Sequence, residues 1–550
     1  MQKRRCVQRF GWLFVVGLLA TVGLFVLWPM AHSAQSSGAG KASIPGVMAV
    51  QSNTTLASDE ESQTFQTIAK TAQFAEIEPY LAALRPALMA DVGQAHMADW
   101  PRYDLALKIN PVARQVVGTQ QVIYTNRETA VLKDIALRLY PNTQYMDGQM
   151  DLTDVRVNDR SVKARFVTRN GRMDRSMVLL SLPEPLAAGQ SLTLSMALTV
   201  TAPLSPTTGY RTFGMIDGML SLPNVYAMIA PREKGRWRLD SIPLFGDVVV
   251  SVMALYRAHI DLPNDYTLVA TGMCKPDSAG IQVCVSGPAR DFAMQVNARY
   301  RVHTTTLHDS VNGDVVIYSY CLPQHDRAGE RALGYAAGAL KSYERRFGLY
   351  PYRELKVFET TTIAGGIEYP MLAGITDSNY ELETNINTNT NGNYFEWLIA
   401  HEVAHQWWYN MVGSNPITEA WLDESLTQYS ASLYIEDRYG EAAARAQRDQ
   451  LFSERYDKER KSKGDRRVGQ PTDLFPRWSY FPIVYGKGPL FFEEVRHNGG
   501  DARFEAWLRT YFVRYRYDVA QADDLLRVAA DVGLADVART AHDRWILGRR

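Results

Sequence analysis

The spacing of hydrophobic positions changes along the chain and predicts two structural parts. From about residue 103 to residue 305, hydrophobic and polar residues alternate. Ile135, Leu137 and Leu139 share one face of such a stretch, and the odd-even pattern of residues 191–200 repeats it. A period of two is typical of half-buried strands. We therefore expect a β-rich domain of the sandwich or saddle kind in the first half of the chain.

From about Arg327 the hydrophobic period becomes helical. RALGYAAGALKSYERRFG predicts a helix that stops at Gly348, and YFEWLIAHEVAHQWW predicts another after an Asn-rich loop. AWLDESLTQYSASLYIEDRYG predicts a third helix, which Gly440 closes, because glycine is favoured just after a helix end. Further helices are expected near 500–515 and 520–550. The fold class is therefore α+β, with strands first and helices after.

The N-terminus carries a targeting signal. Four basic residues lie within residues 1–10, and residues 11–31 contain no charge. The apolar run is long enough to span a bilayer, and the basic flank places the N-terminus inside and the rest of the chain outside the cytoplasm. A cleaved signal peptide is the alternative, and would make the protein secreted or periplasmic. The chain thus divides into five parts. These are a cytoplasmic segment (residues 1–10), an anchor (residues 11–31), a flexible linker (residues 32–73), an N-terminal helix and β-rich domain (residues 74–305) and a catalytic domain (residues 306–550).

The net charge bears on the kind of partner that the protein binds, and the cysteines bear on its redox compartment. The formal net charge is zero, and the absence of a basic stripe or nucleic-acid motif argues against a nucleic-acid partner. Cys274 and Cys284 flank a predicted hairpin and could pair in an oxidising compartment. Independent thiols at Cys274, Cys284 and Cys321 are the alternative.

HEVAH, residues 401–405, is the strongest chemical signal. His401 and His405 are four residues apart, so they lie on one face of a helix, and neutral imidazole is a preferred zinc ligand. Glu402 is placed to act on water as a general base. Chance also produces this pattern, and a catalytic zinc site needs a third ligand. Glu424 on the next predicted helix could supply it, if the two helices pack antiparallel, although it could also be an ordinary surface glutamate.

Several motifs together resemble the aminopeptidase N family of zinc metallopeptidases, which are gluzincins with a thermolysin-like catalytic domain. HEVAHQWW is followed by the glutamate of WLDESLTQY, with eighteen residues between the second histidine and that glutamate. YERRFGLYPYRELKVFE, GGIEYP and VYGKGPLFFEEV resemble family motifs in the family's order. DIALRLYPN and LFGDVVVSVMALYRAHIDLPNDYTLVATG resemble its β domain. The resemblance covers roughly residues 100–550.

This resemblance implies a role for each matching residue. It implies one zinc ion per chain, held by His401, His405 and Glu424, with Glu402 as the water-activating base. Tyr485 would donate a hydrogen bond to the oxyanion, Glu368 would bind the free α-amino group of a peptide substrate, and the backbone near Gly365 and Gly366 would align that peptide. Asp423 would orient a neighbour, with an ordinary helix residue as the alternative.

The chain also departs from the family pattern. GGIEY replaces Gly-Ala-Met-Glu-Asn, and residues 218–232 contain no second amine-binding Gln or Glu. Few residues follow Tyr485, so we expect this chain to lack the large helical domain of many relatives. The leading prediction is a membrane-tethered zinc aminopeptidase. A zinc endopeptidase or amidase using the same site, and a non-catalytic binding protein with a peptidase fold, are the alternatives.

Overall fold

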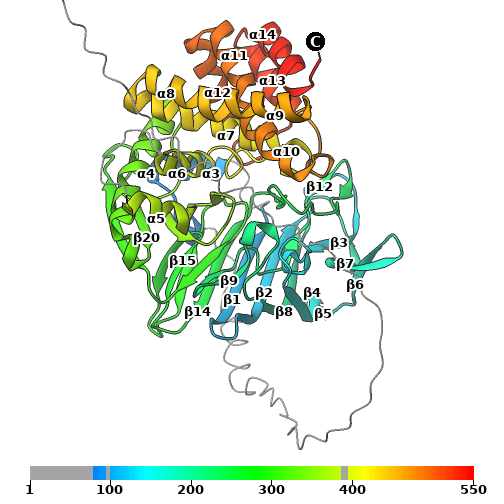
Figure 1. The fold of residues 1–550 in the computed structure, drawn as a ribbon. Coiled ribbons are helices and arrows are strands. Elements are labelled where there is room, and N and C mark those ends of the chain that lie inside the picture. Colours follow the sequence, from blue (N-terminus) through cyan, green and yellow to red (C-terminus); the bar gives the residue numbers. More distant parts are fainter. Residues whose placement is uncertain (1–77, 95–99, 386–393, 550) are drawn as a thin grey trace, which may run out of the picture. The chain divides into compact units, whose positions relative to one another are not determined.

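The computed structural model of the protein describes residues 78–94, 100–385 and 394–549. The expected cytoplasmic segment, anchor and linker, residues 1–73, lie outside the described residues. Within them, none of the helices is both long and apolar enough to cross a bilayer. The strands come first and most helices follow, as the α+β prediction requires (Figure 1).

The first half of the chain is built from antiparallel sheets with one parallel pair. An eight-stranded sheet has the order β16-β17-β14-β1-β2-β8-β4-β5, and β1 and β14 are its parallel neighbours. Its strands are β1 (Arg102–Asn110), β2 (Gln115–Thr125), β4 (Gln149–Val157), β5 (Arg160–Ser161), β8 (Ser191–Thr201), β14 (Leu255–Asp261), β16 (Met273–Pro276) and β17 (Gln282–Val285).

Two four-stranded sheets and a two-stranded ribbon complete this β-rich domain. Their orders are β15-β18-β10-β9, β11-β3-β7-β6 and β12-β13. The strands are β3 (Leu132–Arg138), β6 (Ala164–Arg169), β7 (Arg172–Leu186), β9 (Gly214–Ile216), β10 (Met219–Ser221), β11 (Met228–Ile229), β12 (Arg232–Glu233), β13 (Arg236–Trp237), β15 (Thr267–Ala270) and β18 (Met294–Asn297).

The predicted alternation of side chains holds in these strands. Leu192, Leu194, Met196, Leu198 and Val200 of β8 are all buried, because every second residue of a strand points to the same face. A disulfide joins Cys274 to Cys284 across the β16–β17 hairpin, so the paired alternative is the one present. Cys321 is a buried free thiol.

The second half of the chain begins with a five-stranded sheet of order β19-β20-β21-β23-β22. These strands are β19 (Arg301–Leu307), β20 (Val315–Cys321), β21 (Glu354–Thr360), β22 (Gly366–Tyr369) and β23 (Leu372–Thr376). The expected domain boundary after residue 305 falls inside β19, which pairs with β20. β22 is an edge strand of this sheet, so one side of its backbone remains available for pairing.

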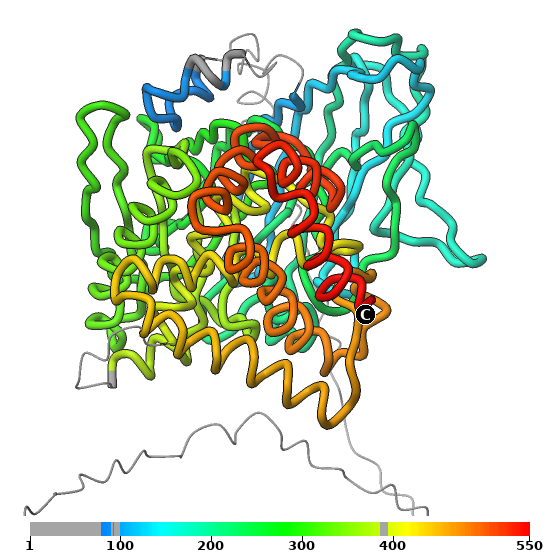
Figure 2. Tube along the Cα trace, turned by 90° about the horizontal axis from the view of Figure 1, so that it is seen from above, coloured from blue at the N-terminus to red at the C-terminus, as the bar shows by residue number. Residues whose placement is uncertain are grey.

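Helices surround this sheet and form the rest of the chain. They are α4 (Asp326–Arg346), α5 (Asp377–Asn385), α6 (Tyr394–Ala404), α7 (Pro416–Tyr439), α8 (Glu441–Arg448), α9 (Arg455–Lys463), α10 (Arg477–Phe481), α11 (Pro489–Gly499), α12 (Asp501–Tyr515), α13 (Ala522–Asp531) and α14 (Ala535–Ala541). Two π-helical turns, η5 (Asp449–Glu454) and η7 (Pro482–Lys487), interrupt the series. Figure 2 shows the last helices, in orange and red, packed together.

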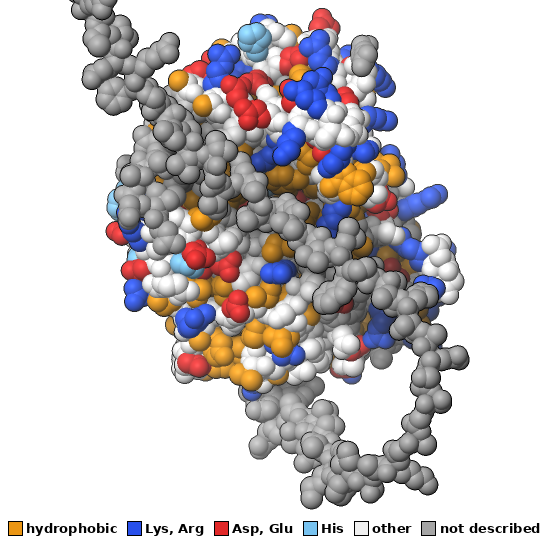
Figure 3. Space-filling view, viewed as in Figure 1, with side chains coloured by type: hydrophobic (Ala, Val, Ile, Leu, Met, Phe, Trp, Pro, Cys, Tyr) orange, Lys and Arg blue, Asp and Glu red, His pale blue; other side chains and the backbone are white. Residues whose placement is uncertain are grey.

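The first helical segment is divided into α2 (Glu78–Leu81) and α3 (Pro86–Gln94). This segment contacts the second half of the chain. The buried Arg85 guanidinium donates to the Tyr350 carbonyl at 3.2 Å and pairs with Asp309 at 2.8 Å. On the face drawn in Figure 3, acidic and basic side chains of the described residues are interspersed.

Candidate metal centre and peptide pocket

The HEVAH stretch lies on α6, a helix that is buried on nearly every side. Its residues from Phe395 to Ala404 are all buried, as expected of a helix that is apolar around its whole circumference. The regular helix ends at Ala404, but the His405 amide still donates to the His401 carbonyl at 3.3 Å. The turn therefore continues long enough to keep His401 and His405 on one face.

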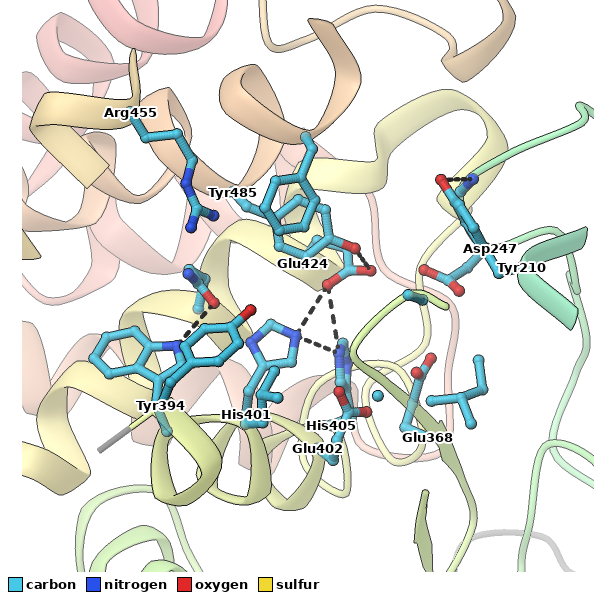
Figure 4. Close-up of a pocket in the computed structure, with 18 residues that line it drawn as sticks. Tyr210, Asp247, Glu368, Tyr394, His401, Glu402, His405, Glu424, Arg455 and Tyr485 are labelled. Carbon is cyan, nitrogen blue, oxygen red and sulfur yellow. Dashed lines mark hydrogen bonds and ion pairs between the residues drawn. The ribbon is translucent and has the colours of Figure 1, made fainter. Parts of the chain in front are cut away.

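The next helix, α7, brings Glu424 back to the two histidines. Asn415 caps α7 by accepting a hydrogen bond from the Ile417 amide, which satisfies a free amide of the first turn. The loop between α6 and α7 reverses the chain, and Figure 4 shows the Glu424 carboxylate beside both imidazoles. Glu424 is buried, so the surface alternative is wrong.

The ring nitrogens of the two histidines and a carboxylate oxygen of Glu424 lie close together. His401 Nε2 lies 3.2 Å from Glu424 Oε2 and 3.2 Å from His405 Nε2. His405 Nε2 lies 3.5 Å from Glu424 Oε2. Ligands about 2.0–2.1 Å from a tetrahedral zinc ion are about 3.3–3.4 Å apart. The triangle therefore has the edge lengths of one face of a zinc tetrahedron.

A further carboxylate supports this triangle from outside. His405 Nδ1 lies 2.8 Å from Asp423 Oδ1 and 3.2 Å from Thr427 Oγ1. A carboxylate on the far nitrogen of a ligand histidine fixes the ring and its tautomer. Asp423 is therefore placed to orient His405. This is the first of the two roles that the sequence allowed for Asp423, the other being an ordinary helix residue.

Glu402 faces the edge strand β22 across the pocket. Its Oε2 atom is buried and has no hydrogen-bond partner among the described residues, as expected of a group kept for substrate or water. A Cβ atom on Gly366 would lie 2.1 Å from Glu402 Oε1. Gly365, just before it, has φ of 105°, a conformation that favours glycine. The two glycines thus turn the chain into β22 and let it approach Glu402.

The close approach at Gly366 gives a testable prediction. Gly366→Ala should displace the Glu402 carboxylate and lower kcat by about 10²-fold, since the base must stay within hydrogen-bond reach of the proton it takes. Zinc content should not change, because His401, His405 and Glu424 are untouched. Gly334→Ala on α4 is the matched control, since nothing lies within 4 Å of a Cβ at that position. Full activity in Gly366→Ala would contradict this placement of Glu402.

Tyr485 reaches the same site from the π-helical turn η7. Its hydroxyl donates to Glu424 Oε1, and its ring centroid lies 6.0 Å from that of His401. The Phe481 ring stacks on Tyr485 with centroids 4.5 Å apart. The extra residue of a π-turn often marks a functional site. Here the phenol is held beside the triangle of ligand atoms.

The structure adds one residue that the sequence did not single out. Asp247, from the loop that precedes β14, lines the pocket with Glu368. Carboxylate oxygens of Asp247, Glu368 and Asp423 lie within 4.8 Å of one another. Asp247 is the one charged residue among residues 241–256. An isolated acid in an apolar stretch is a sequence signal that could have identified it. The β-rich domain therefore does supply an acid to the pocket, although residues 218–232 do not.

The buried carboxylates of the pocket have too few positively charged neighbours to offset the cost of burying their charge. The pKa of Glu368 is raised to about 8, mainly by burial; His405 opposes this increase, and Asp423 and Glu424 add to it. Burial also raises the pKa of Asp247 and of Glu402 well above the usual range. The arrangement favours cations in two places. One is within the His401–His405–Glu424 triangle, whose donors fit zinc, and the other is beside Glu368 and Asp247.

The residues that the sequence assigned to the site line this one pocket, except Gly365 and Asp423. They come from β22, α6, α7 and η7, and Asp247 joins them from the β-rich domain. Figure 4 shows Asp247 and Glu368 on one side of the zinc-ligand triangle and Arg455 on the opposite side. The pocket can thus hold a cation, a second positive group and a chain running past both.

Comparisons with known proteins find relatives among the peptidases. A family profile described as "Peptidase family M1 domain" matches residues 331–545. Human aminopeptidase B is 24% identical over 294 residues, which cover 49% of this chain and 41% of that protein. Aminopeptidase N of Lactobacillus delbrueckii is 26% identical over 161 residues, which cover 27% of this chain and 18% of that protein. The chain therefore spans less than half the length of these relatives.

Solved structures extend the likeness to both halves of the chain. The M1 zinc metallopeptidase of Deinococcus radiodurans superposes with a TM-score of 0.59 at 18% identity, covering 82% of this chain and 94% of that one. A mutant of the same protein, bound to a Tyr-Ser-Ala substrate, gives the same score. At this identity the likeness establishes the fold, a β-rich domain followed by a helical one.

Proposed function

Because the chain carries a Peptidase family M1 domain over residues 331–545, as its resemblance to the aminopeptidase N family implied, we propose that it is a zinc aminopeptidase. It removes residues one at a time from the N-termini of peptides. The observation that carries this proposal is the pairing of two sites in one pocket. A triangle of zinc ligands lies beside Glu402, and two buried acids, Glu368 and Asp247, lie next to it.

The two acids supply the preference for a free N-terminus. A peptide ammonium between Glu368 and Asp247 would form charge-assisted hydrogen bonds and neutralise buried negative charge. An acylated N-terminus carries no charge and leaves both acids unpaired. The edge of β22 would pair with the peptide backbone as an added strand. The first peptide bond is thereby placed at the zinc ligands, and later bonds are not.

The residues of the chain divide the chemical step among them. A zinc ion held by His401, His405 and Glu424 would act as a Lewis acid on the scissile carbonyl and on the attacking water. Glu402 takes a proton from the attacking water and delivers it to the leaving amine. Tyr485 turns its hydroxyl from Glu424 to the oxygen that becomes negative in the transition state. Asp423 holds the His405 ring in place.

Matched pairs of substrates test the proposal. The purified protein, loaded with zinc, should hydrolyse aminoacyl amides with a free amine faster than the same compounds in N-acetylated form. The expected ratio of the kcat/KM values is at least about 10²-fold, because a buried acid is left unpaired when the N-acetylated compound binds. Equal rates for both members of each pair would point to an endopeptidase or amidase. Zinc binding without hydrolysis of any pair would favour the binding-protein alternative.

Asp247 provides a sharper form of the same test. Asp247→Asn should raise KM for free-amine substrates by about 10-fold, because one of two charged partners of the ammonium is lost. Rates on acetylated substrates should stay as low as in the wild type. Asp217→Asn, an exposed acid of the same domain, is the control. An unchanged KM in Asp247→Asn would remove this residue from the amine site.

The remaining expectations are proposals of the same kind. We propose one zinc ion per chain, held by the His401–His405–Glu424 triangle. We also propose that residues 11–31 anchor the chain and that its body lies outside the cytoplasm, which the Cys274–Cys284 disulfide supports, because such bonds persist in oxidising compartments. Protease treatment of intact cells or spheroplasts should degrade the body. Full protection until lysis would contradict this placement.

A further inference from the structure

Arg455 is a cation in the pocket that the proposed chemistry does not use. It stands at the junction of η5 and α9 and lines the pocket together with Gln428 and Trp397. Its guanidinium carbon lies 4.7 Å from the centre of the Phe481 ring. Since Phe481 also stacks on Tyr485, Arg455 is held at a fixed place relative to the oxyanion donor. The guanidinium lies over the ring of Phe481, a position in which a cation is attracted by the ring electrons.

The guanidinium has no partner of opposite charge in the described part of the chain. Neither an ion pair nor a hydrogen bond engages Arg455 there, whereas the nearby Arg448 pairs with Glu441 and Glu493. Burial lowers the pKa of Arg455, and the Tyr394 phenol is the one group that opposes this shift. A half-buried guanidinium without a carboxylate partner raises the free energy of the folded protein, because its charge is partly removed from water. A ligand that supplies a carboxylate would relieve that cost.

The place of Arg455 determines which part of a substrate it can reach. Figure 4 shows Asp247 and Glu368 on one side of the zinc ligands and Arg455 on the other. A peptide whose ammonium lies at the two acids has its first carbonyl at the zinc ligands. The portion that leaves after cleavage then extends toward Arg455. The pocket is therefore negative at the amino end of the substrate and positive at the leaving end.

We propose that Arg455 binds a carboxylate on the leaving portion of the substrate. This carboxylate is the C-terminus of a short peptide or an acidic side chain just after the cleaved bond. The inference rests on the proposed function and adds its substrate class. A planar guanidinium accepts a carboxylate through two parallel hydrogen bonds, so Arg455 discriminates by charge and by shape.

Two sets of peptides separate the two sources of the carboxylate. The first set contains alanine peptides of two to five residues, each as the free acid and as the C-terminal amide. The second contains amidated peptides with Asp or Asn at the second or third position. In the wild type, one free acid or one Asp peptide should exceed its neutral partner by about 10- to 100-fold in kcat/KM, the range for a charge-assisted bond in a buried site.

Variants assign that preference to Arg455. In Arg455→Gln the ratio should fall to within about threefold of unity, and in Arg455→Lys it should be partly retained, since a point charge lacks the fork geometry. Arg460→Gln, on the same helix but exposed and paired with Asp457, should keep the wild-type ratio. Thermal unfolding midpoints confirm that each variant is folded. Affinities of the zinc-loaded Glu402→Gln protein for the same peptides, measured by calorimetry, give a readout independent of turnover.

The outcomes separate this inference from the proposed function. Cleavage of free-amine substrates with acid-to-amide and Asp-to-Asn ratios near unity would overturn the role of Arg455 and leave the aminopeptidase intact. The same conclusion follows if Arg455→Gln keeps the wild-type ratio. If no free-amine substrate is cleaved and the Glu402→Gln protein binds acids and amides equally, both proposals fail.

Discussion

The Glu402→Gln variant is expected to retain zinc and to lose hydrolysis, with kcat lower by roughly 10²- to 10⁴-fold, the usual contribution of a positioned general base. Glutamine has nearly the shape of glutamate but cannot accept the proton of water. Glu402 is not part of the ligand triangle, whose edges join His401, His405 and Glu424. Metal analysis and single-substrate kinetics on the same preparation measure both effects.

Two further results make this prediction decisive. Glu330→Gln, which changes an exposed glutamate of α4, should leave both zinc content and rate unchanged. Loss of zinc from Glu402→Gln would mean that the residue holds the metal rather than the proton. Undiminished hydrolysis with full zinc content would show that another group is the base.

Replacement of Glu424 should have the opposite pattern, because it removes a proposed zinc ligand. Its Oε2 atom contacts both imidazoles and its Oε1 atom accepts the Tyr485 hydroxyl. In Glu424→Gln we expect zinc affinity to fall by about 10²-fold or more, beyond the effect of losing an outer partner. At a fixed free zinc concentration, well above both dissociation constants, a 10²-fold loss lowers the zinc-dependent stabilisation by about 2.7 kcal/mol.

Thermal unfolding at buffered zinc concentrations measures this difference. The wild type should unfold at a higher temperature with zinc than after chelation, and Glu424→Gln should show a smaller difference. Asp423→Asn is the informative comparison, since Asp423 touches His405 from outside the triangle and should weaken zinc binding by about 10- to 100-fold. An identical zinc response in Glu424→Gln and the wild type would exclude Glu424 as a ligand.

Local sequence signals were enough to predict the elements that carry the metal centre. The i, i+4 spacing of His401 and His405 gave the helical face, and Gly440 gave the end of α7, where its φ is 85°. The alternation in residues 191–200 gave a strand with one buried face. Each of these features follows from the period of regular structure or from the conformation of one residue. The next predicted helix offered Glu424 as a candidate third ligand, and the resemblance favoured that role over an ordinary surface glutamate.

Features that depend on contacts between distant segments were not predicted. Asp247 is 121 positions before Glu368, in a β-domain loop with no motif of its own, and only packing brings it to the pocket. Arg455 lies in a polar stretch, ERYDKERKSK, that reads as an exposed helix. The turn η5 just before it directs this side chain inward. The expected boundary at 305 cut β19 because strand pairing with β20, rather than composition, determines where the second sheet begins.

The most direct test of the account is to identify which bond of a peptide is cut. One unmodified peptide of about eight residues is incubated with the zinc-loaded protein, and the products are followed by mass spectrometry over time, with the Glu402→Gln variant in parallel. The account predicts peptides shortened by single residues, in order from the N-terminus, and no products with the variant. Internal fragments that retain the original N-terminus would contradict it.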